Sequence, residues 1–335
     1  MYNRVNQILE QYPFAVKQTY KGRGALICDT DMGLKIVKEY KGSKERADFL
    51  DKTLQFVREN GQERIDCIVK TKEGLTLAKD TDAVVYMVRD WYEGHECDTK
   101  NRDDVLKSIN KLAKLHNILR HFEEEIPEFL QIKPDTLLLE YERHSRELKK
   151  VRNYICAKKK KTDFEIEFAK NYHTFYEQAE GVATLQKKAL NQMQNNQNGG
   201  RHLYGICHGD FNQHNILFSK GGIAILNFEK ALYDVLVSDL SNFIRKILEK
   251  HNWNLGLGMD MLNTYSNVRP LEEEEIRQLY IRLAYPEKFW KISNHYYNSS
   301  KAWVCGRNLE KLSKVVQQNE SRGQFLNFMS HNILF

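Results

Sequence analysis

Residues 208–228 contain the feature that most restricts how this chain can fold. A His-Gly-Asp sequence that ends at Asp210 is followed five residues later by Asn215, which precedes a short apolar run. A turn with two glycines then leads into a second apolar run at 223–226, which ends at Asn227. Two short apolar runs joined by such a turn predict a β-hairpin. The hairpin would anchor a polar loop and bring Asn227 back beside Asn215.

The polar groups of this hairpin suit the transfer of a phosphoryl group. That reaction needs a group that accepts the proton of the nucleophile, together with cations that neutralise phosphate charge. Asp210 suits the role of the proton-accepting base. The amide oxygens of Asn215 and Asn227 suit the ligation of Mg²⁺. A His-Gly-Asp turn alone could precede any hairpin, but the full run over 208–228 is far more specific.

The composition is that of a globular protein with one large or two medium domains. The chain has 335 residues, of which 41% are hydrophobic and 29% charged. A net charge of +6 is modest for this length, so nucleic acid is not an expected partner. No apolar stretch approaches the ~18 residues of a membrane span. The N-terminus lacks the apolar core of a signal peptide, so we expect synthesis in the cytoplasm.

The six cysteines are widely scattered and form no CxxC pair. A chain of this length does not need a disulfide framework. We therefore predict that the cysteines are reduced and mostly structural.

The first ninety residues have the pattern of a small sheet with one helix. Ser43 is a candidate N-cap for the helix, because apolar residues follow it at helical spacing. Strands are predicted at six short β-favouring runs: residues 14–20, 25–28, 34–38, 65–70, 75–78 and 83–88.

From residue 103 onward the apolar spacing is mostly helical. Residues 191–200 are rich in Asn, Gln and Gly and are predicted to form a flexible loop. The aromatic-rich segment 285–303 carries three lysines, which could form an interaction surface. We favour a buried helical core from which the lysines reach solvent.

The fold class that follows is α+β, with two lobes. Residues 1–92 are expected to form a strand-rich lobe that covers a nucleotide. Residues 93–335 are expected to form a helical lobe that includes the hairpin at 206–229. A ligand is expected in the cleft, because clefts between lobes are common binding sites.

Residues 208–217 resemble the HGDxxxxN loop of aminoglycoside and choline phosphotransferases. More closely, the chain resembles the spore coat protein S (CotS) family of endospore-forming bacteria. This wider resemblance rests on five further segments: residues 37–40, 87–94, 112–116, 239–246 and 285–291. It implies a protein-kinase-like fold, ATP and Mg²⁺ as cofactors and no other, location in the endospore coat, and other coat proteins as partners.

The resemblance also implies residues that hold the nucleotide phosphates. Lys38 matches the lysine that neutralises the α- and β-phosphates, with Lys35 as the alternative. A carboxylate of the next helix would orient that lysine. Glu45 is the candidate, with Asp48 and Asp51 as alternatives.

Further roles follow from the same resemblance. Arg89, Asp90 and Trp91 match the hinge that meets adenine through backbone groups. His208 matches a histidine that bonds to backbone and supports the catalytic loop. Asp239 matches a buried Asp that braces this loop by accepting its backbone N–H bonds.

One residue departs from the pattern of active enzymes, which place a metal-binding Asp where this chain has Asn227. Asn keeps an oxygen ligand but loses the negative charge. Because metal-centred charge stabilisation contributes several kcal/mol, the loss could slow catalysis about a thousandfold or more. Glu229, two residues further on, could supply the missing charge.

Three interpretations follow from this departure. The favoured one is a pseudokinase, a coat protein with a structural or assembly role and a degenerate Mg-ATP site. The second is an active ATP-dependent phosphotransferase that acts on a small molecule or a protein, with Asp210 as base. The third is a scaffold that binds ATP without transferring phosphate.

Overall fold

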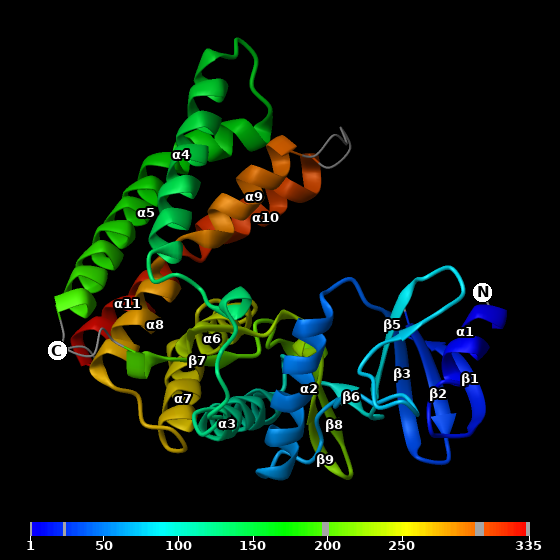
Figure 1. Ribbon diagram of the computed structural model, residues 1–335. Coiled ribbons are helices and arrows are strands. Elements are labelled where there is room, and N and C mark those ends of the chain that lie inside the picture. Colours follow the sequence, from blue (N-terminus) through cyan, green and yellow to red (C-terminus); the bar gives the residue numbers. More distant parts are fainter. Residues whose placement is uncertain (1, 23–24, 196–200, 299–304, 333–335) are drawn as a thin grey trace. The chain divides into compact units, whose positions relative to one another are not determined.

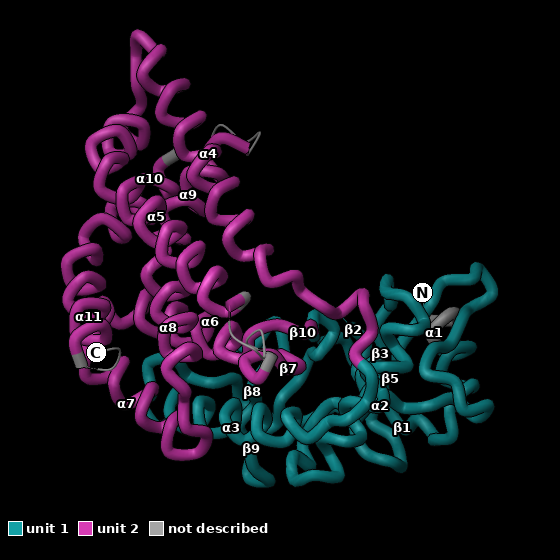
Figure 2. The backbone as a smooth tube through the Cα atoms, turned by 60° about the vertical axis from the view of Figure 1, so that its left-hand side comes forward, with its two compact units in different colours: residues 1–125, 208–231 teal, residues 126–207, 232–335 magenta. Residues whose placement is uncertain are grey.

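The chain divides into two compact units, coloured separately in Figure 2. Unit 1 comprises residues 1–125 and 208–231, and unit 2 comprises residues 126–207 and 232–335. The computed structural model describes all residues except 1, 23–24, 196–200, 299–304 and 333–335. Within the described residues, no helix is long and apolar enough to cross a membrane.

Unit 1 is built on a five-stranded antiparallel sheet with the strand order β1-β2-β3-β5-β4 (Figure 1). The strands are β1 (Val16–Gly22), β2 (Ala25–Thr30), β3 (Gly33–Glu39), β4 (Ala78–Lys79) and β5 (Val85–Asp90). The sheet expected from the β-favouring runs is therefore confirmed. Its core contains Cys28, Val37 and Val88, joined by Ile8 and Leu9 of helix α1 (Tyr2–Leu9), which the sequence analysis did not predict.

The helix predicted after Ser43 is confirmed as α2 (Lys44–Glu59), and Ser43 is its N-cap. The Ser43 hydroxyl accepts a hydrogen bond from the Arg46 N–H at 3.2 Å, which satisfies one unpaired donor of the first turn. A second helix of unit 1, α3 (Arg102–Leu119), begins where helical spacing was predicted.

The strand predicted over 65–70 is wrong. Only isolated bridges form there, from Ile65 to Ile225 and from Ile68 to Arg89. The physical reason is that this segment pairs with two different partners in turn, so it never runs alongside one strand for long enough. Of the strand predicted over 75–78, only Ala78 lies in a strand, namely β4, which continues to Lys79.

The predicted hairpin is confirmed as β8 (Ile216–Ser219) and β9 (Gly222–Ile225), with Ile216 opposite Ile225. Strand β6 (His95–Glu96) pairs with β8 to complete a three-stranded sheet. This pairing and the Ile65 bridge place the hairpin in unit 1. The division of the chain thus differs from the expected boundary at residues 92 and 93.

Unit 2 is mainly helical. Its helices are α4 (Thr136–Ala157), α5 (Asp163–Asn195), α6 (Val237–Leu248), α7 (Leu255–Ser266), α8 (Glu273–Ala284), α9 (Glu287–Asn298), α10 (Cys305–Gln317) and α11 (Asn319–Asn332). Strands β7 (Tyr204–Cys207) and β10 (Leu232–Val235) pair in antiparallel fashion. The expected α+β class, with a strand-rich unit and a helical unit, is confirmed.

Helix α5 extends further than the sequence suggested, to Asn195. The flexible loop predicted over 191–200 is therefore wrong in its first half, and 196–200 lie outside the described residues. Leu190 and Met193 are buried, so the apolar face of the helix continues into the Asn- and Gln-rich segment.

The interpretation of 285–298 as helical core is confirmed, while 299–303 lie outside the described residues. Phe289 is fully buried and stacks on Phe168 and Phe175 of α5. Lys288 and Lys291 are exposed, as expected, and each forms an ion pair with a glutamate. The five described cysteines are free, as predicted.

His144 of α4 is buried within this helical unit. Its ring stacks on Trp290, with ring centroids 3.4 Å apart. Burial, with Arg143 and Lys291 nearby, lowers the pKa of His144 from 6.5 to about 4. Between pH 6.5 and 4, His144 is therefore mostly unprotonated in the folded state and mostly protonated in the unfolded state.

This difference predicts a loss of stability in acid. As pH falls from 6.5 toward 4, only unfolded chains bind the proton, so the free energy of unfolding should fall by about 2 to 3 kcal/mol from this group. His144→Phe keeps the stack and removes the titration. Urea denaturation at pH 7.5 and 4.5 should show a smaller loss in the variant. An equal loss in both proteins would contradict this prediction.

Candidate functional site

The loop before the hairpin is held by backbone geometry and by one histidine. Gly209 has a φ of +76°, and a Cβ there would lie 2.0 Å from the Lys230 carbonyl oxygen, so only glycine fits. The ring of His208 is fully buried. Its Nδ1 lies 3.2 Å from the Asp210 N–H, and its Nε2 lies 2.8 Å from the Leu226 carbonyl. His208 thus joins the loop to the end of β9.

Asp210 is partly exposed, and both of its carboxylate oxygens have partners. Oδ1 accepts from Asn212 Nδ2 at 2.9 Å, and Oδ2 accepts from Lys230 Nζ at 3.0 Å. Asn215 Nδ2 donates to the backbone oxygen of Asp210 at 2.9 Å. The loop therefore orients the Asp210 carboxylate from both sides.

Asn215 and Asn227 lie together and bond to each other. Asn227 Nδ2 donates to Asn215 Oδ1 at 2.7 Å. Asn227 has a left-handed backbone, with φ of 66° and ψ of 56°, a conformation that Asn tolerates better than most residues. The amide oxygen of Asn215, a predicted metal ligand, thus already accepts a hydrogen bond.

The guanidinium of Arg89 lies against the same asparagine. Arg89 Nη2 donates to Asn227 Oδ1 at 3.2 Å and to Glu229 Oε1 at 2.7 Å. Arg89 Nη1 forms an ion pair with Asp66 at 3.0 Å. Arg89 is 3% exposed and Asp66 is fully buried, whereas the Glu229 side chain is 41% exposed. One buried cation therefore joins two carboxylates and Asn227.

The two lysine candidates differ in what they contact. Lys38 Nζ lies 3.4 Å from Asn227 Oδ1. Lys35 Nζ donates to Asp90 Oδ1 at 2.7 Å. Residues three apart on a strand face opposite sides of the sheet, so Lys38 is the lysine that reaches the asparagines.

Glu45 lies exposed in the first turn of α2. Bonds from its own backbone N–H and from Ser43 lower its pKa, so its carboxylate forms part of the helix cap. The alternatives also have partners: Asp48 accepts from Thr76 at 2.6 Å, and Asp51 pairs with Lys70 at 3.0 Å.

The expected hinge residues use their backbone donors within the protein. The Asp90 N–H donates to the Cys67 carbonyl and the Trp91 N–H to the Leu34 carbonyl, each at 2.9 Å. In this conformation neither N–H is available to an adenine. Arg89 contributes its side chain to the site, a role that the sequence analysis did not give it.

Asp239 belongs to unit 2, where it is buried in the first turn of α6. The asparagine site, by contrast, belongs to unit 1.

Sequence analysis also missed Asp66. Its Oδ2 accepts the Asn227 N–H at 2.9 Å as well as pairing with Arg89, and its Oδ1 has no hydrogen-bond partner among the described residues. Burial raises the pKa of Asp66 from 3.8 to about 6. A single aspartate in a segment mistaken for a strand gave no local signal of this role.

The donor set does not fit a divalent cation. Mg²⁺ prefers carboxylate and other oxygen ligands. The oxygen of Asn227 faces two cationic donors, Arg89 and Lys38, and that of Asn215 accepts from Asn227. Glu229, the expected substitute carboxylate, is bound to Arg89 instead.

An HGDxxxxN loop before a hairpin, together with an antiparallel sheet and a helical unit, defines a kinase-like phosphotransferase fold. The chain belongs to the family described as spore coat putative kinase YutH, whose model matches residues 5–329. The expected resemblance to spore coat protein S is also confirmed. That protein of Bacillus subtilis is 25% identical over 340 residues, which cover 96% of this chain and 92% of its own length.

Solved structures with the same fold include two phosphotransferases. An aminoglycoside phosphotransferase from Alicyclobacillus acidocaldarius has a TM-score of 0.83 at 19% identity, covering 97% of this chain and 94% of that one. An AMP-bound spectinomycin phosphotransferase has a TM-score of 0.61 at 12% identity, covering 95% and 98% respectively. At these identities the likeness shows the fold alone.

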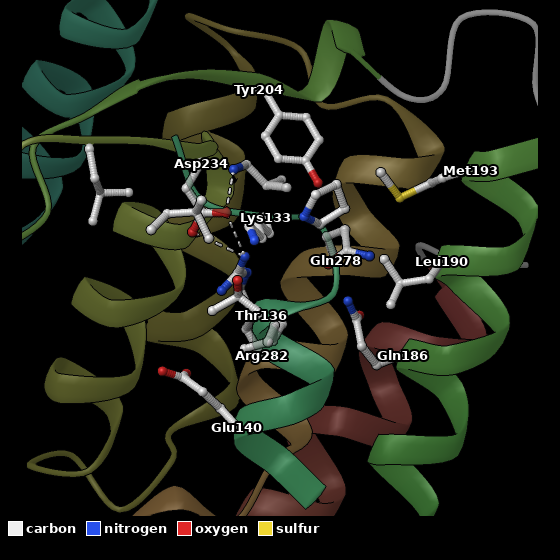
Figure 3. A pocket seen from close by; sticks show the side chains of 15 residues that line it. Lys133, Thr136, Glu140, Gln186, Leu190, Met193, Tyr204, Asp234, Gln278 and Arg282 are labelled. Atoms are coloured by element: carbon white, nitrogen blue, oxygen red, sulfur yellow. Dashed lines mark hydrogen bonds and ion pairs between the residues drawn. The ribbon is translucent and has the colours of Figure 1, made fainter. Parts of the chain in front are cut away.

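Unit 2 contains a cavity of about 190 Å³ that the sequence gave no means to find (Figure 3). Its lining comes from five separate segments, including Gln186 of α5, Gln278 of α8 and Asp234 of β10. Asp234 is paired with Arg282 at 3.3 Å. Gln186 is 2% exposed, and its Oε1 has no hydrogen-bond partner among the described residues.

The network around Arg89 predicts a stability loss that depends on pH. Arg89→Met would leave Asp66 buried without its ion pair, which typically costs about 3 to 5 kcal/mol at neutral pH. Folded Asp66 takes up a proton at a higher pH than unfolded Asp66, so part of this loss should be recovered at pH 5. Urea denaturation at pH 7.5 and 5 measures both values.

Arg58→Met is the matched control. Arg58 pairs with Asp90, but its side chain is 33% exposed, so the loss should be about 1 kcal/mol. If Arg89→Met cost no more than Arg58→Met, the central role of the Arg89 network would be wrong.

The cavity predicts an unusual result for Gln186→Leu. Because replacing an unpaired buried polar group by an apolar one removes a desolvation cost, the free energy of unfolding should stay unchanged or rise by about 1 kcal/mol. Thermal and urea denaturation measure the change. A loss of more than about 1 kcal/mol would mean that Gln186 has a bonding partner in solution.

Proposed function

We propose that this chain is a component of the endospore coat with a structural or assembly role, and that its kinase-like site is degenerate toward Mg-ATP. Membership of a spore coat family and the relation to spore coat protein S support the location and the coat proteins as partners. The observation that supports the degenerate site most directly is the contact of Arg89 and Lys38 with Asn227.

The degenerate site is supported by the chemistry of its donors. In an active kinase-like site, an Asp at this position bridges the metal ions that hold the phosphates. Here the residue is a neutral Asn, its amide bonds to Asn215, and Arg89 holds the neighbouring Glu229. Binding a metal ion would require these contacts to break.

One observation favours the second candidate, an active phosphotransferase. The Asp210 carboxylate is 30% exposed and is oriented by Asn212 and Lys230, as a catalytic base requires. Several structural relatives are phosphotransferases, and another is an amicoumacin kinase in complex with AMP-PNP, Ca²⁺ and Ami. The two candidates differ in whether Asp210 is needed in the cell.

In the test, the chromosomal gene of a sporulating host is replaced by a copy that encodes the Asp210→Asn variant. A structural or assembly role predicts that the variant chain still enters the coat, and that coat protein composition and spore lysozyme resistance match the parent. A deletion strain gives the defect for comparison. If Asp210→Asn reproduced the deletion defect while its chain accumulated at the parent level, the phosphotransferase would be favoured and our proposal would fail.

A further inference from the structure

We propose that one exposed face of helix α4 binds an acidic helical segment of another coat protein. The face is formed by Leu139, Arg143, Arg146, Lys150 and Tyr154, and we refer to it as the basic face. This inference rests on the proposed function, which places the chain among coat proteins. It adds the surface that meets a partner and the chemistry of that partner.

The five residues of the basic face follow one another at intervals of three or four positions along α4. Side chains at that spacing lie on one side of a helix. All five are exposed, Leu139 by 54% and Tyr154 by 56%. The buried residues of α4 lie at other positions: Tyr141, His144, Ser145, Leu148 and Ile155. Helix α4 therefore packs with one side, where it lies beside α5 (Figure 1), and exposes the basic face on another.

Positive charge is concentrated on and beside the basic face. Residues 143–161 contain nine Lys or Arg and a single acidic residue, Glu147. The net charge of the whole chain is only +6, so the rest of the chain has a slight excess of acidic residues. A local excess of one charge attracts and orients a partner of the opposite charge.

The arginines of the basic face have weak partners within the chain. Arg146 pairs with Glu142 at 3.9 Å, and both side chains are exposed, so this pair contributes little to stability. Arg143 Nη2 lies 3.2 Å from Nε2 of His144, whose pKa of about 4 leaves the ring uncharged at neutral pH. Guanidinium groups bind carboxylates through paired N–H donors, so carboxylates of a partner would be stronger acceptors.

An apolar side chain stands near each end of the basic face. Leu139 and Tyr154 are about 22 Å apart along the helix axis, from the rise per residue of an α-helix. The Tyr154 ring lies edge-on to Tyr297 of α9, with ring centroids 5.4 Å apart, so a neighbour holds it while it stays exposed. This order of groups matches an amphipathic helix that lies along α4, with carboxylates between two apolar residues. A single-stranded nucleic acid would favour several aromatic rings among the basic residues, and the basic face has one.

A second copy of this chain matches the basic face less well. The longest acidic run in the sequence is Glu272–Glu275, which rises about 5 Å along a helix. Glu272 caps α8, and Glu275 is buried in an ion pair with Arg269. The run is too short to span the basic face and is partly bonded already. The partner is therefore a different protein.

The experiment places a photo-cross-linking residue in the basic face of the full chain in a sporulating host. Tyr154→benzoylphenylalanine keeps an aromatic ring at the exposed position. Irradiation while the coat forms should link the chain to one coat protein. Mass spectrometry of the linked peptide should identify a segment with a net negative charge and acidic residues at helical spacing. Leu185→benzoylphenylalanine, at a site on α5 that is 42% exposed, is the control and should not link to that segment.

Four results would overturn the inference. They are the absence of any cross-link from position 154, a cross-link to nucleic acid, a cross-link to a second copy of the chain, and a cross-link to a segment that is not acidic.

Charge reversal tests the basic residues in the chain that carries the cross-linker at position 154. Arg146→Glu combined with Lys150→Glu sets like charges against the acidic segment, so the cross-link yield should fall about tenfold or more. Lys187→Glu combined with Lys188→Glu is the matched control, since it makes the same change at exposed positions of α5. It should change the yield less than twofold. Equal losses from the two pairs would overturn the assignment to the basic face.

A milder pair of substitutions serves if charge reversal lowers the amount of chain. Arg146→Gln combined with Lys150→Gln removes the two charges without reversing them and should lower the yield about threefold. An unchanged yield would contradict the inference.

The outcome is distinguishable from a failure of the proposed function. A chain that enters the coat without this cross-link would contradict the inference alone, whereas a chain absent from the coat would contradict the proposed function.

Discussion

The ion pair between Arg89 and Asp66 is the interaction on which the site depends. Both groups are buried, and burying two charges is tolerated only when they are paired. Arg89 comes from β5, Asp66 from the segment that bridges to it, and Asn227 lies two residues after the end of β9. The pair therefore joins the sheet to the hairpin beside Asn227.

Under the proposed function, this arrangement accounts for a kinase-like fold that is kept with a degenerate metal site. The loop keeps Gly209 and His208, which fix its geometry, and an Asp210 carboxylate that is oriented by its neighbours. At Asn227 the negative charge has gone, and a guanidinium and a lysine meet the remaining oxygen. Under the proposed function, an Asn at this position weakens metal binding because it supplies no negative charge.

Much of the fold could be predicted from the sequence, because it is encoded in local spacing. The hairpin and the helix after Ser43 each follow from residues near one another in the chain. Position 89 was assigned to a backbone role because its partners, Asp66 and Asn227, are distant in sequence. The choice between Lys35 and Lys38 required the strand register, which composition does not supply. The cavity near Gln186 is lined by separate segments, so no single motif could indicate it.

The central claim is that the protein's own cations have replaced the metal. Titration with Mn²⁺, followed by electron paramagnetic resonance with ATP present and absent, tests it most directly, because bound and free Mn²⁺ give different signals. The account predicts no Mn²⁺ bound by the protein in either condition beyond weak surface sites that Asn215→Ala leaves unchanged. A stoichiometric Mn²⁺ site that Asn215→Ala abolishes would contradict it.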